Sequence, residues 1–272
     1  MKLYYANSTK ADAEVTVLGL PYDRTSSFIP GSRFGPQYIR QCAENIEDYS
    51  PYQNKSLGDL RVCDLGDIQF HGEDWLGQIE EESAKIVDGK RLPVFLGGEH
   101  TITPAIVRAM KKTCGSFTLV QFDAHCDLRD EYLGEKNCHA TAMRRASDVL
   151  GADRIFQFGI RSGTREEFES GNNLYKFEVF KHLSKVIDQI REPIYISIDI
   201  DVLDPSAMPA VSTPEPGGIS YRELVDSLVL FGNKKVIGAD IVEYNPLAAS
   251  PYASGSTVAE VLRELILVAT HT

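Results

Sequence analysis

Three potential metal ligands follow one apolar stretch near the middle of the chain. Residues 117–122 are mostly apolar and include β-branched side chains, a pattern that predicts a buried strand. Asp123, His125 and Asp127 come directly after it. In extended backbone, residues at a spacing of two point to the same side. The three side chains should therefore converge at the carboxyl end of the strand, where open α/β sheets place their sites.

Two further predicted strands deliver ligands of the same kind. Residues 193–198 form a mostly apolar run that ends in Asp199 and Asp201, two carboxylates expected on the same side. Residues 93–98 form another such run and lead to His100. Three strand ends with these side chains indicate a site rather than separate structural roles.

The six side chains, two imidazoles and four carboxylates, predict two divalent metal ions. Structural zinc sites favour cysteine, whereas carboxylate with imidazole suits manganese better, although softer metals compete for such ligands. Because six ligands are few for two ions, some carboxylates must bridge them, as in other two-metal sites. Asp123 and Asp199, one from each of two strands, are the predicted bridges.

The elements that must position these ligands alternate along the chain. Strands are predicted at residues 14–20, 61–65, 93–98, 117–122, 154–159, 174–177, 193–199 and 235–242, and helices at 36–49, 74–88, 103–112, 140–149, 164–170, 178–190, 221–231 and 258–269. This alternation indicates an α/β fold with a mainly parallel sheet, but a TIM barrel alternates in the same way. No repeat or linker divides the chain, so we expect a single domain over residues 1–272.

Composition narrows the class of protein. The chain has 272 residues, of which 43% are hydrophobic and 25% charged, which is typical of a globular protein with a sizeable core. A formal net charge of −11 disfavours nucleic-acid and anionic-membrane partners and is compatible with a cationic substrate.

The cysteines and the chain's N-terminal residues indicate a cytoplasmic protein. The five cysteines are an odd number without a CxxC pair, which favours reduced thiols. Residues 1–14 lack the apolar core of a signal peptide. No segment approaches about 18 uninterrupted apolar residues, the length that suggests a membrane span.

Several segments resemble the signatures of the ureohydrolases, the arginase and agmatinase family. They are Gly97-Gly98-Glu99-His100, Asp123-Ala124-His125-Cys126-Asp127 and residues 197–205, together with residues 213–218 and 240–246. The match runs in order from about Val17 to the last predicted helix. The resemblance implies a three-layer α/β/α fold with a mainly parallel eight-stranded sheet. It also implies a homo-oligomer of three or six subunits, two Mn²⁺ ions per subunit, and hydrolysis of a guanidinium group to urea and an amine.

The resemblance also implies how the ligands divide between the two ions. One ion would bind His100, Asp123, Asp127 and Asp199, and the other would bind Asp123, His125, Asp199 and Asp201. General chemistry agrees with this arrangement, because two cations lower the pKa of a bridging water and so produce hydroxide at neutral pH. A resonance-stabilised guanidinium needs such a strong, positioned nucleophile.

Three residues match the family's catalytic positions. Asp127 is expected to bond the hydroxide and then pass the proton to the departing amine. His139 resembles the family's proton-shuttling histidine, with a helix cap as the alternative. Glu243 resembles the carboxylate that grips the guanidinium with paired hydrogen bonds. Asp204 precedes Pro205, so we expect it to form a turn rather than to bind metal.

The loop at residues 128–138 should discriminate between guanidines. Arginases carry a polar serine-glycine-asparagine type of segment there, of which this chain keeps only Asn137. Asp130, Glu131 and Glu135 would repel a carboxylate and attract an amine, which favours agmatine, cleaved to putrescine and urea. Arg129 and Lys136 instead favour an acidic tail such as that of guanidinobutyrate. The sequence is also compatible with aminopropylagmatine or arginine as the substrate, and with a formimidoylglutamase-like reaction.

Two rival classes use similar residues. A two-metal phosphoesterase could share the ligands, but the sequence offers no basic phosphate cradle. An inactive relative could keep the metals for stability alone, but it would not need Asp127, His139 and Glu243. Cys126 and Cys138 lie within the motifs, and we interpret both as small side chains that fit their positions.

Overall fold

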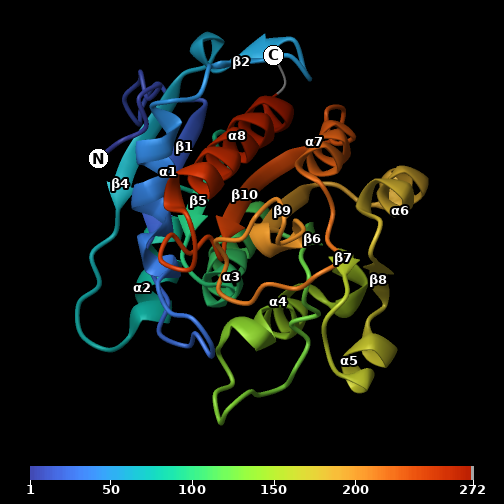
Figure 1. The fold of residues 1–272 in the computed structure, drawn as a ribbon. Coiled ribbons are helices and arrows are strands. Elements are labelled where there is room, and N and C mark those ends of the chain that lie inside the picture. Colours follow the sequence, from blue (N-terminus) through green and yellow to red (C-terminus); the bar gives the residue numbers. More distant parts are fainter. Residues whose placement is uncertain (271–272) are drawn as a thin grey trace.

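A computed structural model describes residues 1–270, which are built around an eight-stranded parallel sheet (Figure 1). Its strands lie in the order β4-β1-β5-β10-β9-β6-β7-β8, and each pair of neighbours is parallel. The strands are β1 Val15–Leu20, β4 Val62–Asp67, β5 Leu92–Gly97, β6 Thr118–Phe122, β7 Ile155–Ile160, β8 Asn173–Lys176, β9 Ile194–Asp199 and β10 Val236–Val242. Because β4 and β8 form the two edges, the sheet is open and a barrel is excluded.

Helices cover both faces of the sheet. On one face lie α1 Gly35–Ala43, α6 Val179–Val186, α7 Tyr221–Val229 and α8 Pro251–Ala269. On the other face lie α2 Trp75–Ala84, α3 Thr103–Cys114 and α4 Ala142–Leu150, while α5 Arg165–Ser170 follows β7 (Figure 1). The predicted three-layer α/β/α fold is confirmed.

Successive side chains of each buried strand point to opposite faces of the sheet, and they therefore contribute to two separate hydrophobic cores. In β5, Val94 and Leu96 pack into the core under α1 and α8, whereas Phe95 packs into the core under α2 and α3. Every residue of β5, β6 and β9 is buried. Strands covered on both faces require such nearly continuous apolar runs, which explains why the central strands were recognisable in the sequence.

Two helix boundaries differ most from the sequence-based expectation. Helix α1 ends at Ala43 rather than near residue 49, and the chain then forms a small hairpin of β2 Tyr49–Ser50 and β3 Lys55–Ser56. Ser50 donates to Glu264 of α8 (2.7 Å), a tertiary contact that local propensity does not encode. Helix α8 begins at Pro251, seven residues earlier than expected, with a proline in its first turn. Near this start Gly255 packs closely on Cys42 of α1, where a Cβ atom would lie 2.5 Å from the sulfur.

The carboxyl ends of β5, β10, β9 and β6 are adjacent and form one shared edge of the sheet. Gly98 lets the chain after β5 approach the segment after β1, since a Cβ atom there would lie 2.0 Å from the Tyr22 carbonyl oxygen. The Gly98 carbonyl also accepts a hydrogen bond from the Glu243 amide (2.7 Å). The glycine of this motif therefore serves close backbone packing beside the predicted ligands.

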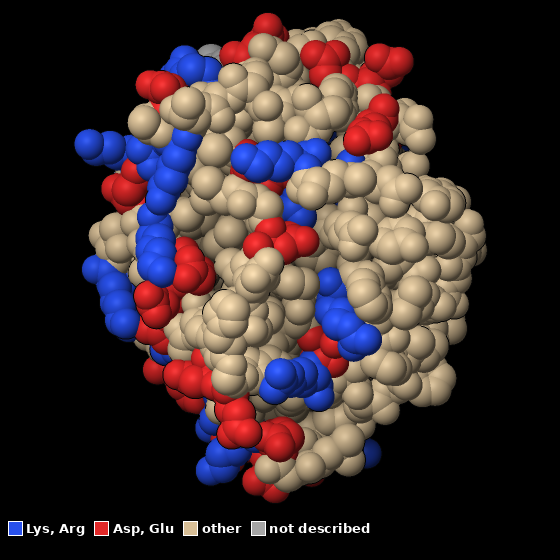
Figure 2. All heavy atoms as spheres, turned by 90° about the vertical axis from the view of Figure 1, so that its left-hand side faces the viewer, with Lys and Arg blue, Asp and Glu red and all other residues tan. Residues whose placement is uncertain are grey.

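Charged side chains of both signs are mixed over the face that Figure 2 shows. Basic and acidic groups lie next to one another on this side of the molecule. Although the net charge of the chain is negative, this face therefore does not form a single negatively charged patch. Among residues 1–270, no helix combines the length and apolarity needed to span a membrane.

Candidate functional site

All six predicted ligands lie at the shared edge of β5, β6 and β9. His100 begins a short 3-10 turn after β5, and Asp123, His125 and Asp127 follow β6. Asp199 ends β9. Asp201 lies in the next turn, where its amide donates to the Asp199 carboxylate (2.9 Å). The structure thus brings together side chains that are up to 101 positions apart, counted from His100 to Asp201.

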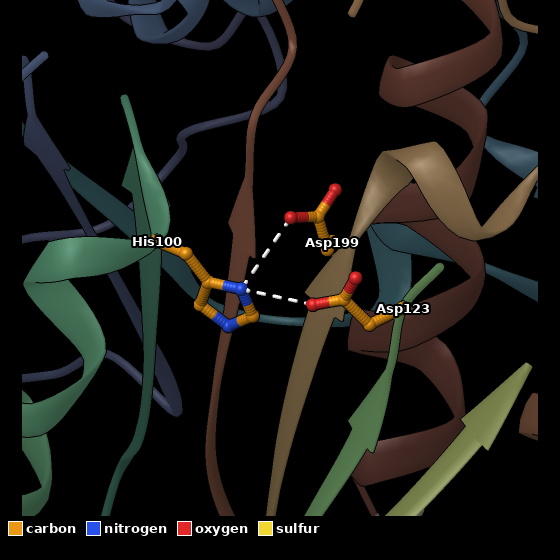
Figure 3. A group of neighbouring side chains, drawn as sticks. All are labelled: His100, Asp123 and Asp199. Carbon is orange, nitrogen blue, oxygen red and sulfur yellow. Dashed lines mark ion pairs between the residues drawn. The ribbon is translucent and has the colours of Figure 1, made fainter. Parts of the chain in front are cut away.

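The first group gathers around His100 (Figure 3). Its Nδ1 atom lies 3.1 Å from Asp123 Oδ2 and 3.4 Å from Asp199 Oδ2, and these two carboxylates point toward the ring from neighbouring strands. Asp127 Oδ2 lies 3.2 Å from the same nitrogen. One imidazole nitrogen facing three buried carboxylate oxygens is a donor set suited to a divalent cation.

A second group shares Asp123 with the first and adds His125 and Asp201. His125 Nδ1 lies 2.9 Å from Asp201 Oδ2 and 3.6 Å from Asp123 Oδ1. Asp123 therefore presents one oxygen to each group, as a bridging carboxylate requires. Asp199 belongs to the first group alone in this geometry, so its predicted bridging role stays a prediction.

Two buried atoms support the fit of a cation. His100 Nδ1 and Asp201 Oδ2 are shielded from solvent and have no hydrogen-bond partner of adequate geometry. Buried polar atoms are normally satisfied, so an unpaired imidazole nitrogen and carboxylate oxygen at the centre of the cluster indicate electron pairs available to a metal.

A second layer of hydrogen bonds fixes how His100 presents its nitrogen. His100 Nε2 lies 3.0 Å from Ser197 Oγ, which donates to Asp240 Oδ1 (2.6 Å). Because the Ser197 proton goes to Asp240, the hydroxyl oxygen accepts from Nε2–H, which leaves the Nδ1 lone pair directed at the carboxylates. Such outer partners orient a metal-binding histidine and select its tautomer.

Asp123 is held by a similar chain of contacts. Gln121 Nε2 donates to Asp123 Oδ2, and Gln157 Nε2 donates to Gln121 Oε1 (2.6 Å). All three side chains are buried. Although burial acts in the opposite direction, the nearby imidazoles of His100 and His125 lower the pKa of Asp123. The shared carboxylate is therefore ionised and ready to bind cations at neutral pH.

Asp127 and Glu243 have left-handed backbone conformations, which are uncommon for residues other than glycine. Their φ angles are +54° and +65°. Such strain concentrates at functional sites, where the surrounding structure enforces it. Burial, and next the charge of Asp123, raises the pKa of Asp127 to about 6. A carboxyl group with that pKa exchanges protons readily near neutral pH.

Glu243 follows β10 and reaches the same cavity. Its Oε1 accepts a hydrogen bond from the His100 amide (2.7 Å), and its side chain is 5% exposed. Burial raises the pKa of Glu243 well above its ordinary value. A desolvated carboxylate next to the metal ligands would gain strongly from a cationic partner.

His139 lies across the cavity in a 3-10 turn before α4. Its Nε2 is 3.2 Å from Ser27 Oγ, its Nδ1 is 3.5 Å from Thr25 Oγ1, and its ring meets Tyr132 edge-on. Burial, and next the charges of His125 and His100, lowers the pKa of His139 to about 4. The imidazole is therefore neutral at physiological pH and able to accept a proton.

These groups line a cavity of about 210 Å³. It is lined by Ser27, His100, His125, Cys126, Asp127, Arg129, Tyr132, His139, Ala140, Ser162, Gly163, Glu167, Asp199, Thr213 and Glu243. Carboxylates and imidazoles occupy the floor, and Arg129 with Glu167 forms part of the wall. The volume suits a small extended molecule rather than a polymer.

The structure corrects the electrostatic interpretation of the loop at residues 128–138. Asp130, Glu131 and Glu135 are exposed and do not line the cavity, and Asp130 pairs with Arg145 (2.7 Å). Asn137 is exposed and faces a different, smaller cavity. The sequence shows how many charged residues the loop carries, but only the path of the loop decides which of their side chains face the cavity.

Glu167 is the cavity carboxylate that sequence reasoning missed. It is 5% exposed, accepts from the Leu128 amide (3.0 Å) and the Thr164 amide (2.8 Å), and lies 3.4 Å from Arg129 Nε. The sequence did carry a signal, a capping box from Thr164 to Glu167 at the start of α5. That motif explains the helix start but not the position beside the cavity.

The expected turn role of Asp204 is confirmed. Its carboxylate accepts from the Ser206 hydroxyl and amide and from the amides of Gly217 and Gly218. These bonds, the Ser206 hydroxyl first, lower the pKa of Asp204 to about 2. Cys126 and Cys138 are buried free thiols, consistent with their interpretation as small side chains that fit their positions.

An open parallel sheet with two groups of His and Asp at its carboxyl edge defines an α/β protein with a candidate metal site, and comparison with known proteins identifies its family. The chain belongs to the arginase family, whose sequence profile matches residues 13–268. Agmatinase from Bacillus anthracis is 40% identical over 266 residues, covering 94% of this chain and 92% of the relative. N(1)-aminopropylagmatine ureohydrolase from Thermococcus kodakarensis is 36% identical, covering 89% and 86%.

A solved structure has the same fold over most of the chain. A candidate agmatinase from Clostridium difficile superposes with a TM-score of 0.91 and 36% identity, covering 96% of this chain and 98% of that one. The resemblance to ureohydrolases and the arginase-like fold are thus confirmed. The protein is an agmatinase-type ureohydrolase, a hydrolase acting on C–N bonds of linear amidines.

Proposed function

We propose that the protein hydrolyses agmatine to putrescine and urea with two manganese ions bound in the described cavity. The observation that carries the proposal is the pair of His/Asp groups that share Asp123 beneath a buried Glu243. The similarity to agmatinase of Bacillus anthracis over 94% of the chain supports the choice of substrate.

The residues divide between two ion positions. His100, Asp123, Asp127 and Asp199 would hold one ion, and Asp123, His125, Asp199 and Asp201 the other. When bound, the ions supply the positive charge that lets a water molecule act as a nucleophile at neutral pH. Manganese is proposed because the donors are carboxylate oxygens and imidazole nitrogens without a thiolate among them.

Glu243 binds and orients the guanidinium. Two N–H groups of the substrate donate to its carboxylate and replace the water lost on entry, which directs the guanidinium carbon toward the floor of the cavity. Water adds to this carbon, and the bond from the carbon to the alkyl-bearing nitrogen breaks. The products are urea and the diamine putrescine.

Asp127 and His139 handle the protons. Asp127 takes the proton released from the attacking water and passes it to the departing nitrogen, a role that suits its raised pKa. His139, neutral because its pKa is low, exchanges protons between the amine and solvent at the mouth of the cavity. Both side chains line the same cavity as Glu243.

The tail of the substrate would lie against Glu167 and Arg129. A primary ammonium can pair with the buried Glu167 carboxylate, whereas a carboxylate tail would require Arg129 to leave Glu167. Guanidinobutyrate, aminopropylagmatine and arginine are the competing substrates. A formimidoylglutamase-like reaction is the competing chemistry.

A urea-release assay tests the proposal directly. Purified protein is supplied with agmatine, aminopropylagmatine, guanidinobutyrate and arginine in turn, with manganese and after chelation. We expect agmatine to have the highest kcat/KM and activity to require manganese. A higher kcat/KM for arginine or guanidinobutyrate would overturn the choice of agmatine, and urea release that survives chelation would contradict the metal requirement.

Four broader properties belong to the same proposal. We propose that residues 1–272 form one catalytic domain and that it assembles as a homotrimer or hexamer. The cytoplasm is the proposed compartment, and it agrees with five free cysteines. Small cationic guanidines, rather than nucleic acids or membranes, are the proposed partners. Light scattering at several protein concentrations measures the oligomer.

A further inference from the structure

We propose that Glu99 is a positioning residue that anchors the loop at residues 22–35 and, through Thr25, holds the ring of His139 in its working orientation. This inference rests on the proposed proton-transfer role of His139. Glu99 lies next to His100 in the sequence, but its contacts run in a different direction, toward the loop that faces His139.

Glu99 is a fully buried carboxylate surrounded by donors from one loop. Its oxygens accept from the Thr25 amide (3.1 Å to each oxygen), the Thr25 hydroxyl (2.8 Å) and the Ser26 hydroxyl (3.3 Å). The Thr101 hydroxyl donates as well (2.9 Å). Because every partner is a hydrogen-bond donor, both oxygens of the Glu99 carboxylate must act as acceptors.

The hydroxyl of Thr25 links Glu99 to His139. A hydroxyl has a single proton, and the Thr25 proton is directed at Glu99, so Thr25 Oγ1 faces its other neighbours as an acceptor. Those neighbours are the His139 amide (3.3 Å) and the His139 ring Nδ1 (3.5 Å). The contact therefore favours the tautomer of His139 with its proton on Nδ1.

The opposite ring nitrogen is then free to accept a proton. His139 Nε2 lies 3.2 Å from Ser27 Oγ, and both His139 and Ser27 line the cavity. Ser27 comes directly after Ser26, which is itself bonded to Glu99. One buried carboxylate thus controls the loop residues on both sides of the imidazole, which fixes the tautomer and the direction of the lone pair together.

The first test measures the access of reagent to His139 without substrate. Glu99→Gln places an amide N–H₂ group against donors, which should release Thr25 and loosen the loop. Modification by diethyl pyrocarbonate, followed by mass spectrometry, should then be faster at His139 by at least about threefold, since loss of a hydrogen-bonded contact opens the site locally. The exposed His71 serves as the internal reference.

A matched control separates positioning from general loss of a buried charge. Glu264 is also fully buried and accepts from Ser50, Gln53 and Arg263, away from the loop. Glu264→Gln should leave the modification rate of His139 at the wild-type value. Equal rates in wild type and Glu99→Gln, or an equal increase in Glu264→Gln, would overturn the proposal.

The second test is a double-mutant cycle on agmatine hydrolysis. Glu99→Gln should lower kcat by about tenfold with KM changed less than about threefold, and it should retain manganese. In a His139→Asn background the same change should alter kcat by less than about threefold, because the group it positions is gone. A full tenfold loss in both backgrounds would show that Glu99 acts independently of His139.

Thr25→Val provides a second route if Glu99→Gln does not fold. This change keeps the shape and the carboxylate but removes the linking hydroxyl, so it should reproduce the faster modification of His139, and Thr25→Ser should reverse it. A Thr25→Val protein with wild-type reactivity would refute the link. If wild-type protein releases no urea from any guanidine, the proposed function fails, whereas the labelling tests still decide the position of His139.

Discussion

At the scale of single residues, the site depends on carboxylates held in unequal surroundings. Asp123 is surrounded by imidazoles and amide donors, which lower its pKa, whereas Glu243 is buried beside other acids, which raises its pKa. The first environment suits a permanent metal ligand. The second leaves a carboxylate that gains from a cationic substrate.

Asp123→Ala tests whether one carboxylate serves both ions. Removing it takes a ligand from each His/Asp group, so we expect manganese content to fall at both positions and kcat/KM to fall by at least about a hundredfold. Elemental analysis and the urea assay measure the two effects. Asp226→Ala, on the surface of α7, is the control. Two ions retained per subunit would refute the shared role.

Glu243→Gln tests the substrate clamp separately from the metal ligands. Glutamine keeps the shape but loses the charge and turns a donor toward the substrate's own N–H groups. We expect kcat/KM to fall by on the order of a hundredfold, about 3 kcal/mol, with manganese content unchanged. Because burial raises the pKa of Glu243, the melting temperature should not fall. Near-normal turnover would remove Glu243 from substrate binding, and lost metal would make it a support of the cluster.

At the scale of elements, the loops that follow the strands are tied together by one arginine. Arg161, after β7, donates to the carbonyls of Asp201 (2.7 Å) and Glu215 (2.9 Å) and also to those of Gly159, Val202 and Leu203. A planar guanidinium offers five N–H donors spread over three nitrogens, so it can serve more carbonyls than the three donors of a single ammonium nitrogen. Arg161 thus fixes the segment that carries Asp201.

Arg161→Lys should show this in stability and metal binding together. Lysine keeps the charge but leaves several carbonyls without their donor, so we expect a loss of about 2–3 kcal/mol in the free energy of unfolding and weaker manganese binding. Urea denaturation and metal titration measure the two quantities. Arg222→Lys, on the exposed side of α7, should change neither. Unchanged stability would mean that the loop is held by other contacts.

At the scale of the whole molecule, the cluster couples folding to pH and to metal. Burial raises the pKa of Asp199 and Glu243 well above their ordinary values, and raises that of Asp127 to about 6. Although burial opposes it, hydrogen bonds and charges from Asp123, Asp127, Asp199 and Asp201 raise the pKa of His100 and His125 well above 6.5. In each case the folded chain binds protons more tightly than the unfolded chain.

Chelated protein should therefore lose stability as pH rises. At pH values between the unfolded and the folded pKa of a group, the folded state holds more protons than the unfolded state. The stabilisation that the histidines contribute is therefore complete below pH 6.5 and is lost as the pH rises through their folded pKa values. We expect the melting temperature of chelated protein to be lower at pH 8 than at pH 6 by roughly 5 °C. Manganese should raise it most at pH 8, because cations replace the protons. A melting temperature that rises with pH would contradict this coupling.

The amino-acid sequence by itself determined the central strands and the positions of the predicted ligands at their ends. Buried parallel strands need continuous apolar runs, and a spacing of two places side chains on one side, so residues 117–127 and 193–201 indicated both the strands and the ligand groups before any folding. By contrast, the adjacent positions of β5, β10, β9 and β6 depend on the order of strands in the sheet. The alternation of strands and helices does not reveal this order, and a barrel alternates in the same way.

Only the tertiary structure decided what the remaining charges face. Asp130 and Glu135 lie in the loop beside the site motif, yet they point to solvent, whereas Glu167 reaches the cavity from α5, 28 positions after His139. The first turns of helix α8, which begins at Pro251, likewise pack against α1 through Gly255. Local pattern records periodicity and residue type, but the direction of a loop side chain and the start of a packed helix are settled by contacts between distant segments.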